Sequence, residues 1–169
     1  MKTLLISLLL ISSLSHADFE AEVRKTNLSY SWGQYGQYDL DLIQVGGSYY
    51  TESNIGFRAL VGQSNEGSDD LGYTSKRVKT RNFWTLNLNK RFDISNSVSL
   101  QGGLNYTEYK SCVNGKCNPD TSLGYGVAVE YELSSDYSLK LSYDDYYSKD
   151  NGYTVETTTG IGLSLVARF

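Results

Sequence analysis

The chain has 169 residues, of which 40% are hydrophobic and 20% are charged, and its formal net charge at pH 7 is −4. No run of 18 or more apolar residues occurs, which excludes a helical membrane span in the mature protein, and an acidic balance without a Lys/Arg stripe excludes nucleic acid as a partner. A mean hydropathy of −0.38 fits a soluble domain, but 15 Tyr, 16 Gly and a single Pro indicate many strands with few breaks.

Residues 1–17 have the pattern of a secretory signal peptide. Lys2 precedes an apolar run from Leu4 to Leu14, and small residues up to Ala17 form a cleavage site. A buried N-terminal helix is the alternative interpretation. Cleavage after Ala17 leaves residues 18–169 as one domain, and it removes His16, which is the only histidine of the chain.

Apolar and polar residues alternate with a period of two along most of the chain, which is typical of β-strands with two different faces. The pattern predicts eight strands, in residues 21–32, 38–50, 55–62, 83–92, 98–107, 122–133, 137–147 and 158–169. In the first strand, Leu28 is assigned to the apolar face. In the second, the apolar parity slips after Leu42, which predicts a bulge near Asp41.

The connections between these strands alternate in length. Short turns are predicted at residues 51–54, 93–96 and 134–136, and longer links at residues 33–37, 65–80, 110–120 and 149–156. Tight turns at one end and longer loops at the other are the layout of an outer-membrane barrel. The predicted fold is therefore all-β, an eight-stranded antiparallel up-and-down transmembrane β-barrel.

The contents of the two faces favour a membrane barrel over a secreted, lipocalin-like barrel. The polar face carries small residues and isolated charges, which suit a narrow, crowded lumen. We expect these charges to form a lumen ion-pair network of Arg58, Arg91, Glu130, Lys140, Asp144 and Arg168. The apolar face carries aromatic residues at both strand ends, as two membrane interfaces require. One belt contains Trp32, Trp84, Tyr106, Tyr125, Tyr143 and Tyr147, and the other contains Phe57, Phe92, Tyr131, Tyr137 and Phe169.

Cys112 and Cys117 are predicted to form a disulfide. They bracket Asn114-Gly115, a strong tight-turn signal, and export would place them in an oxidising compartment. Zinc binding by the two thiols is the competing interpretation, but two thiols without further Cys or His do not complete a tetrahedral site. The disulfide would staple a loop.

The last strand ends with apolar residues at alternate positions up to a terminal aromatic, namely Ile161, Leu163, Leu165 and Phe169. With the strand number and loop alternation, this ending resembles the small outer-membrane β-barrel proteins of Gram-negative bacteria. The resemblance is greatest to the outer-membrane protein X and adhesin family, and more distant to the membrane domain of outer-membrane protein A. It implies that the ending is a signal read by the barrel-assembly machinery, and that the function is adhesion, envelope-stress response or resistance to host defence.

The sequence offers little catalytic chemistry. A mature chain without histidine lacks the usual base for nucleophilic catalysis, so a carboxylate dyad of Glu130 with Asp144 or Glu132 is the remaining option, and structural ion pairs are the better interpretation. We expect no enzyme activity, cofactor or metal. The predicted protein is a monomer of the bacterial outer membrane whose loops contact host or cell-surface ligands; a narrow pore for small solutes is the alternative.

Charged residues also occur in the longest predicted loop. Asp69 and Asp70 are two carboxylates for a cation, although calcium requires six or more oxygens and solvated charges explain them equally well. Basic residues near the end of the loop are candidates for contacts with lipopolysaccharide phosphates, with ordinary surface charge as the alternative. These are Lys76, Arg77, Lys79 and Arg81.

Overall fold

The computed structural model describes residues 18–31, 37–65, 67–69, 76–113, 115–148 and 157–169. These residues form nine antiparallel strands. In chain order the strands are β1 (Asp18–Ser31), β2 (Gln37–Tyr50), β3 (Ile55–Ser64), β4 (Gly67–Asp69), β5 (Lys76–Asp93), β6 (Val98–Val113), β7 (Lys116–Glu132), β8 (Tyr137–Ser148) and β9 (Thr157–Arg168). No helix in the described part of the chain is long and apolar enough to cross a membrane.

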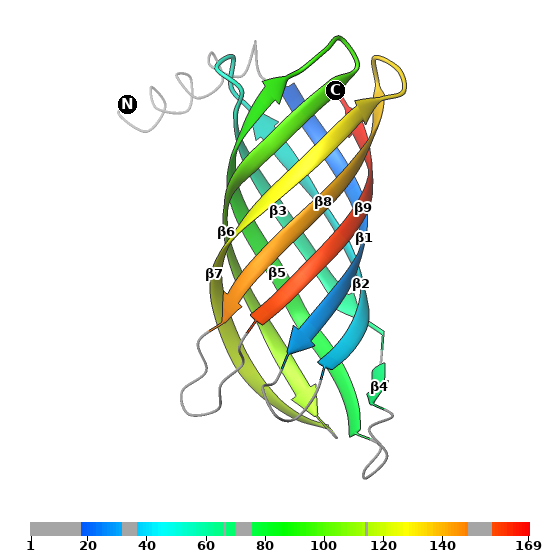
Figure 1. Cartoon of the computed structure of the whole chain (residues 1–169), viewed down its shortest axis with the longest axis vertical. Coiled ribbons are helices and arrows are strands. Elements are labelled where there is room, and N and C mark those ends of the chain that lie inside the picture. Colours follow the sequence, from blue (N-terminus) through cyan, green and yellow to red (C-terminus); the bar gives the residue numbers. More distant parts are fainter. Residues whose placement is uncertain (1–17, 32–36, 66, 70–75, 114, 149–156) are drawn as a thin grey trace, which may run out of the picture.

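Eight of the strands close into a barrel. Neighbours in sequence pair with each other, the first strand β1 pairs with the last strand β9, and β3 pairs with β5. The short β4 continues beyond β3 and pairs with the start of β5. Figure 1 shows the strands tilted around one long axis, with the start of β1 and the C-terminus at the same end. The predicted eight-stranded up-and-down barrel is confirmed.

The two faces of the wall differ as the alternation predicts. Large apolar side chains point outward, and Leu104 on β6 exposes 67% of its surface. Polar and charged side chains point into the lumen, where Arg24 on β1 is completely buried. A soluble barrel would have the opposite arrangement, so the outer wall is suited to lipid.

Three four-residue turns lie at one end of the barrel, at residues 51–54, 94–97 and 133–136, close to the predicted positions. In the first turn Asn54 has φ 59° and donates its backbone N–H to the Thr51 carbonyl at 2.8 Å; Asn tolerates this left-handed conformation better than most residues. This end of the barrel is called the short-turn end, and the opposite end the long-link end.

At the long-link end the strands extend further than predicted. The link predicted at residues 110–120 is a β-hairpin, because β6 and β7 remain paired up to Val113 and Lys116. Part of the link predicted at residues 65–80 is also strand, in β4 and the start of β5. The turn signals in these segments predict links, but strand pairing continues through part of each segment.

The bulge predicted near Asp41 is wrong. Pairing of β2 with β1 and with β3 continues without a shift, and the apolar parity slips because Leu40 and Leu42 point into the lumen. Leu28 also points into the lumen instead of outward. The bulge lies elsewhere, between Arg81 and Trp84 of β5 opposite β6.

Candidate functional site

The centre of the barrel holds eight buried charged side chains, called here the lumen charge cluster. Four are cations and four are carboxylates, so their formal charges cancel. They are Glu20, Glu22, Arg24, Arg58, Arg91, Glu130, Lys140 and Asp144. Arg168 joins them from the short-turn end, where it is partly exposed. The charges predicted for the lumen all lie in this group.

Near the short-turn end, Glu130 on β7 is the centre of the contacts. Arg91 on β5 approaches one of its oxygens at 3.5 Å, and Arg168 on β9 binds the other at 2.7 Å. Gln101 and Ser138 each donate a hydrogen bond of 2.5 Å to the same carboxylate. A buried carboxylate needs this number of donors, because its desolvation is costly when it is unpaired.

Deeper in the lumen, β1 faces β8. Arg24 forms an ion pair with Asp144, and Lys140 Nζ lies 3.3 Å from Glu22 Oε2. Arg58 on β3 lies between the two carboxylates, 3.6 Å from Glu22 and 3.9 Å from Asp144. The cluster is therefore continuous across the lumen and connects strands that are far apart in sequence.

The β1 members of the cluster were not predicted from the sequence. Glu20, Glu22 and Arg24 alternate with outward Ala21 and Val23, and this parity was the available signal. It is a weak signal because two of the three residues are acidic, and acidic residues at a chain start usually face solvent. Arg91 also stacks on Tyr50, 3.8 Å from the ring centroid, a cation–π contact that closes the cluster on the β2 side.

A second group, the apolar lumen cluster, fills the lumen between the charges and the long-link end. Its members are Leu28, Leu40, Leu42, Phe83, Tyr109 and Tyr146. The Phe83 ring stacks on Tyr109 with centroids 5.7 Å apart and meets Tyr146 edge-on at 5.9 Å. The interior therefore has an ionic layer and a layer whose large side chains are apolar or aromatic, where small polar side chains such as Thr26, the ladder partner of Leu42, are also buried.

The inside of the barrel contains a large cavity at the short-turn end and a very small one among the charges. At the short-turn end a cavity of about 710 Å³ opens between the turns, and Arg91, Glu130 and Arg168 contribute to its lining. In the middle of the lumen, a cavity beside Arg58 and Asp144 measures about 20 Å³, which is space for about one water molecule.

The carboxylates considered as a catalytic dyad do not form one. Glu130 is paired with Arg91 and Arg168, whereas Asp144 is paired with Arg24. Arg168, which binds Glu130, also lies 3.3 Å from a carboxylate oxygen of Glu132. Among the described residues, no group of three or more His, Cys, Asp or Glu has the arrangement of a metal site.

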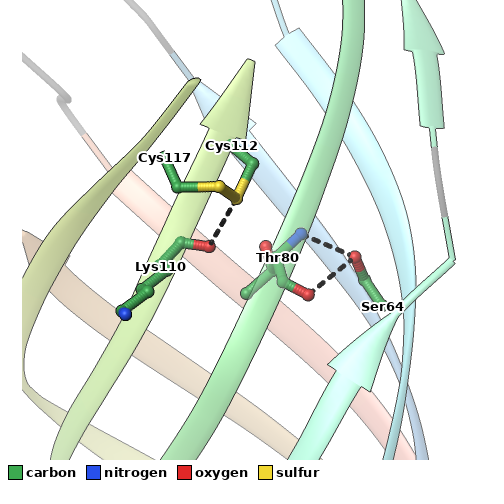
Figure 2. Close-up of a disulfide and its surroundings, with 5 residues drawn as sticks. All are labelled: Ser64, Thr80, Lys110, Cys112 and Cys117. Atoms are coloured by element: carbon green, nitrogen blue, oxygen red, sulfur yellow. Dashed lines mark hydrogen bonds between the residues drawn. A yellow bond between two sulfur atoms is a disulfide. The ribbon is translucent and has the colours of Figure 1, made fainter. Parts of the chain in front are cut away.

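Cys112 and Cys117 form the predicted disulfide across the β6–β7 hairpin (Figure 2). They occupy directly opposite positions of the ladder, so the bond staples a hairpin that is already paired. Of the predicted loop charges, Asp69 lies in β4 and Lys79 and Arg81 lie in β5. Asp70 is outside the described residues, and the side chains of Lys76 and Arg77 are too.

Aromatic side chains mark both ends of the outer wall. Trp84 and Tyr106 form a tilted pair, with centroids 5.5 Å apart, towards the long-link end. The predicted belt members at the short-turn end, Phe57, Phe92, Tyr131, Tyr137 and Phe169, are all exposed on the outside. The side chains of Trp32 and Tyr147 are outside the described residues. Of the predicted C-terminal signal, Ile161, Leu163 and Leu165 also point outward, and the Phe169 N–H donates to the Phe19 carbonyl at 2.9 Å.

A closed barrel with an apolar, aromatic-bounded outside and an ionic interior defines a class, the small transmembrane barrels of the bacterial outer membrane. The chain belongs to the outer membrane protein beta-barrel domain family, whose pattern matches residues 3–169. It is accordingly a bacterial outer-membrane protein. No curated protein sequence matches the chain.

Solved structures share the fold at low sequence identity. Neisserial surface protein A is 17% identical with a TM-score of 0.62, and the match covers 92% of this chain and 98% of that one. The attachment invasion locus protein Ail of Yersinia pestis, in complex with the heparin analogue sucrose octasulfate, is 13% identical with a TM-score of 0.59, covering 91% and 99%. OprG of Pseudomonas aeruginosa is 12% identical with a TM-score of 0.54, covering 91% and 96%.

Proposed function

We propose that this protein is a non-enzymatic scaffold that displays its long-link end at the cell surface, with a lumen closed to solutes. The observation that carries the proposal is the two-layer interior. An ion crossing the lumen would have to separate ion pairs in the lumen charge cluster, and then enter the apolar lumen cluster without its water. Both steps are costly in free energy.

The proposed exposed surface is the stapled β6–β7 hairpin together with the neighbouring links. The disulfide joins the two strands of this hairpin and restricts their motion, which lowers the entropy cost of binding a partner. Ail, which has this fold, was solved in complex with the heparin analogue sucrose octasulfate. By analogy of fold alone, we propose host or cell-surface ligands as partners of the hairpin.

Other proposed contacts follow from the location. The outer wall contacts outer-membrane lipid and lipopolysaccharide, and residues Ile161, Leu163, Leu165 and Phe169 serve as the signal for the barrel-assembly machinery. A monomer is proposed because a closed barrel leaves no unpaired strand edge. Enzyme activity is not proposed, since Glu130 and Asp144 are held in ion pairs with different cations and the mature chain would lack histidine.

Planar-bilayer recording tests the closed lumen. Purified wild-type protein is expected to give no stable channels, as is a matched variant with an outward substitution, Leu104→Ala. Stable channels whose conductance changes in Arg91→Ala or Glu130→Ala would contradict the proposal and establish the alternative, a narrow pore. That alternative is considered because of the 710 Å³ cavity at the short-turn end, which would be its vestibule.

The display function has a separate test. Cells that produce the wild-type protein are compared, in adhesion to cells or immobilised sulfated polysaccharide, with cells whose β6–β7 hairpin is shortened to a two-residue turn after Glu108. Loss of adhesion supports the proposal, provided that the shortened protein keeps heat-modifiable mobility on detergent gels. Equal adhesion by both would exclude the hairpin as the contact surface.

A further inference from the structure

The lipid-facing wall has a groove of about 560 Å³ near the long-link end, between β2, β3 and β5. Most of its lining is apolar, with polar side chains only at one end. The lining residues are Ile43, Val45, Val61, Gly62, Gln63, Asn82, Phe83 and Trp84; the side chain of Phe83 is itself buried in the apolar lumen cluster. The groove is shallow and open along the lipid-facing side of the wall, so a long, flexible apolar group could lie along it.

The groove adjoins an interruption in the pairing of the barrel wall. Pairing of β3 with β5 ends at Gly62 and Phe83, and it resumes only at Gly67 in β4. Across the interruption, the Thr80 N–H donates to Ser64 Oγ at 2.7 Å, and Ser64 Oγ donates to the Thr80 carbonyl at 3.3 Å, as Figure 2 shows.

The β5 bulge lies at the same height. Asn82 has φ 50°, and the bulge leaves Arg81 and Asn82 both exposed, so two consecutive side chains reach the outer surface. The backbone thus departs from the regular ladder at the place where the groove ends. A bulge typically redirects a side chain in this manner.

Two cations stand side by side just beyond the groove. Arg81 and Lys110 are directly opposite in the β5–β6 ladder and both are exposed. Like charges in this position repel each other, and neither forms an ion pair with any residue that the structure describes. By contrast, exposed Lys25 on β1 is paired with Asp41 at 2.9 Å. Within the described part of the chain, the Arg81 and Lys110 pair therefore has no carboxylate partner of the kind that Lys25 has.

Trp84 gives the height of this arrangement in the membrane. It lines the groove and packs against Tyr106, and such amphipathic rings occupy the membrane interface. The apolar groove therefore reaches from the interface towards the hydrocarbon, and the cations lie on the side of the phosphate groups.

We propose that the groove and the Arg81–Lys110 pair form one site for lipopolysaccharide, with an acyl chain of its lipid anchor in the groove and a phosphate group between the two cations. The apolar lining matches the acyl chain. The two cations, which form no ion pair with a described residue, match the phosphate, which Arg binds through two parallel hydrogen bonds. This inference rests on the lipopolysaccharide contact proposed above and names its location; it is independent of the closed lumen and of the display function.

The test measures lipopolysaccharide binding to the full-length refolded barrel in zwitterionic detergent, by titration and by the shift in thermal unfolding. The wild-type protein is expected to bind lipopolysaccharide more tightly than phosphatidylglycerol. The double variant R81Q/K110Q is expected to lose about tenfold or more in affinity, the equivalent of about 1.4 kcal/mol. Lipopolysaccharide without its lipid phosphates is expected to bind both proteins equally weakly.

Two further variants separate the parts of the site. Val61→Phe fills the groove and leaves the cations in place, and it is expected to weaken binding by at least severalfold. Lys90→Gln removes one positive charge from β5 near the short-turn end and is expected to bind as wild type. Heat-modifiable mobility verifies that each variant is folded. Wild-type affinity in R81Q/K110Q or in Val61→Phe would overturn the site, and so would equal binding of phosphatidylglycerol by the wild-type protein.

Discussion

The two layers of the lumen fill the same kind of space by opposite means. Towards the short-turn end, the lumen charge cluster relies on partners: Lys140 and Glu22 are both completely desolvated and each has the other within 3.3 Å. Towards the long-link end, the apolar lumen cluster relies on shape, since Leu42 and Phe83 are as deeply buried without any charge. The side chains of both layers are buried, but only in the ionic layer does a single neutral substitution leave a partner with an uncompensated charge.

This difference follows from how each layer is stabilised. Removing one partner of a buried ion pair leaves an uncompensated charge, whereas removing both leaves only smaller, neutral groups. Removing an apolar side chain leaves a cavity whose cost depends on its volume. In the ionic layer, the effects of substitutions on the free energy of unfolding are therefore strongly non-additive. In the apolar layer, they are close to additive for residues that do not touch.

The largest effect is expected from Lys140→Met. It leaves the carboxylates of the lumen charge cluster in excess, and we expect a loss of about 3–5 kcal/mol in the free energy of unfolding, measured by urea unfolding of the refolded barrel. The double variant K140M/E22Q restores neutrality and should recover a large part of that loss. If the double variant is as unstable as the sum of the single variants, the ionic layer is not coupled as described.

Leu42→Ala should have the next largest effect. The substitution leaves a cavity in the apolar lumen cluster, with an expected loss of about 2–5 kcal/mol in the free energy of unfolding. Ile43→Ala, one residue further along β2 and facing outward, is the control, because lipid fills the space that it leaves. Equal losses for both variants would contradict the assignment of Leu42 to the lumen.

Reduction of the disulfide should have a smaller effect. The bond closes a short loop, for which the chain-entropy estimate is about 2 kcal/mol, and it lies in a hairpin beyond both layers. We expect Cys112→Ser/Cys117→Ser to lower the urea midpoint modestly and to leave heat-modifiable mobility intact. If mass spectrometry finds two free thiols in protein taken from outer membranes, the disulfide is absent from the mature protein and the prediction is wrong.

The smallest effect is expected at the ion pair between Lys25 and Asp41 on the outer surface. Both side chains are largely exposed, so water and salt screen their attraction. Lys25→Gln should leave the urea midpoint within experimental error. A loss comparable to that of Lys140→Met would show that burial is not what gives the lumen pairs their importance.

The fold was predictable because period-two alternation and turn spacing are local signals. The lumen position of Glu130, Lys140 and Asp144 followed from the same parity. Leu28 was assigned to the outer face, and the slip at Leu42 was interpreted as a bulge, because the lumen is apolar towards the long-link end. Alternation does not distinguish an apolar interior from an apolar exterior. The β5 bulge was also missed, since nothing at Asn82 in the sequence indicates that the ladder ends nearby; it depends on where β3 stops pairing.

The pairing of β1 with β9 joins the two ends of the domain, and Arg24 meets Asp144 across 120 positions of sequence. Before β8 and β9 complete the barrel, Arg24 of β1 lacks Asp144 and Glu22 lacks Lys140. A register error of one residue would turn Glu22 towards lipid. Only a complete barrel, closed in one register, pairs all the charges at its centre. A truncated chain, or one in the wrong register, would keep unpaired charges, which oppose insertion into the membrane. The charged interior therefore favours the correctly assembled barrel over these alternatives.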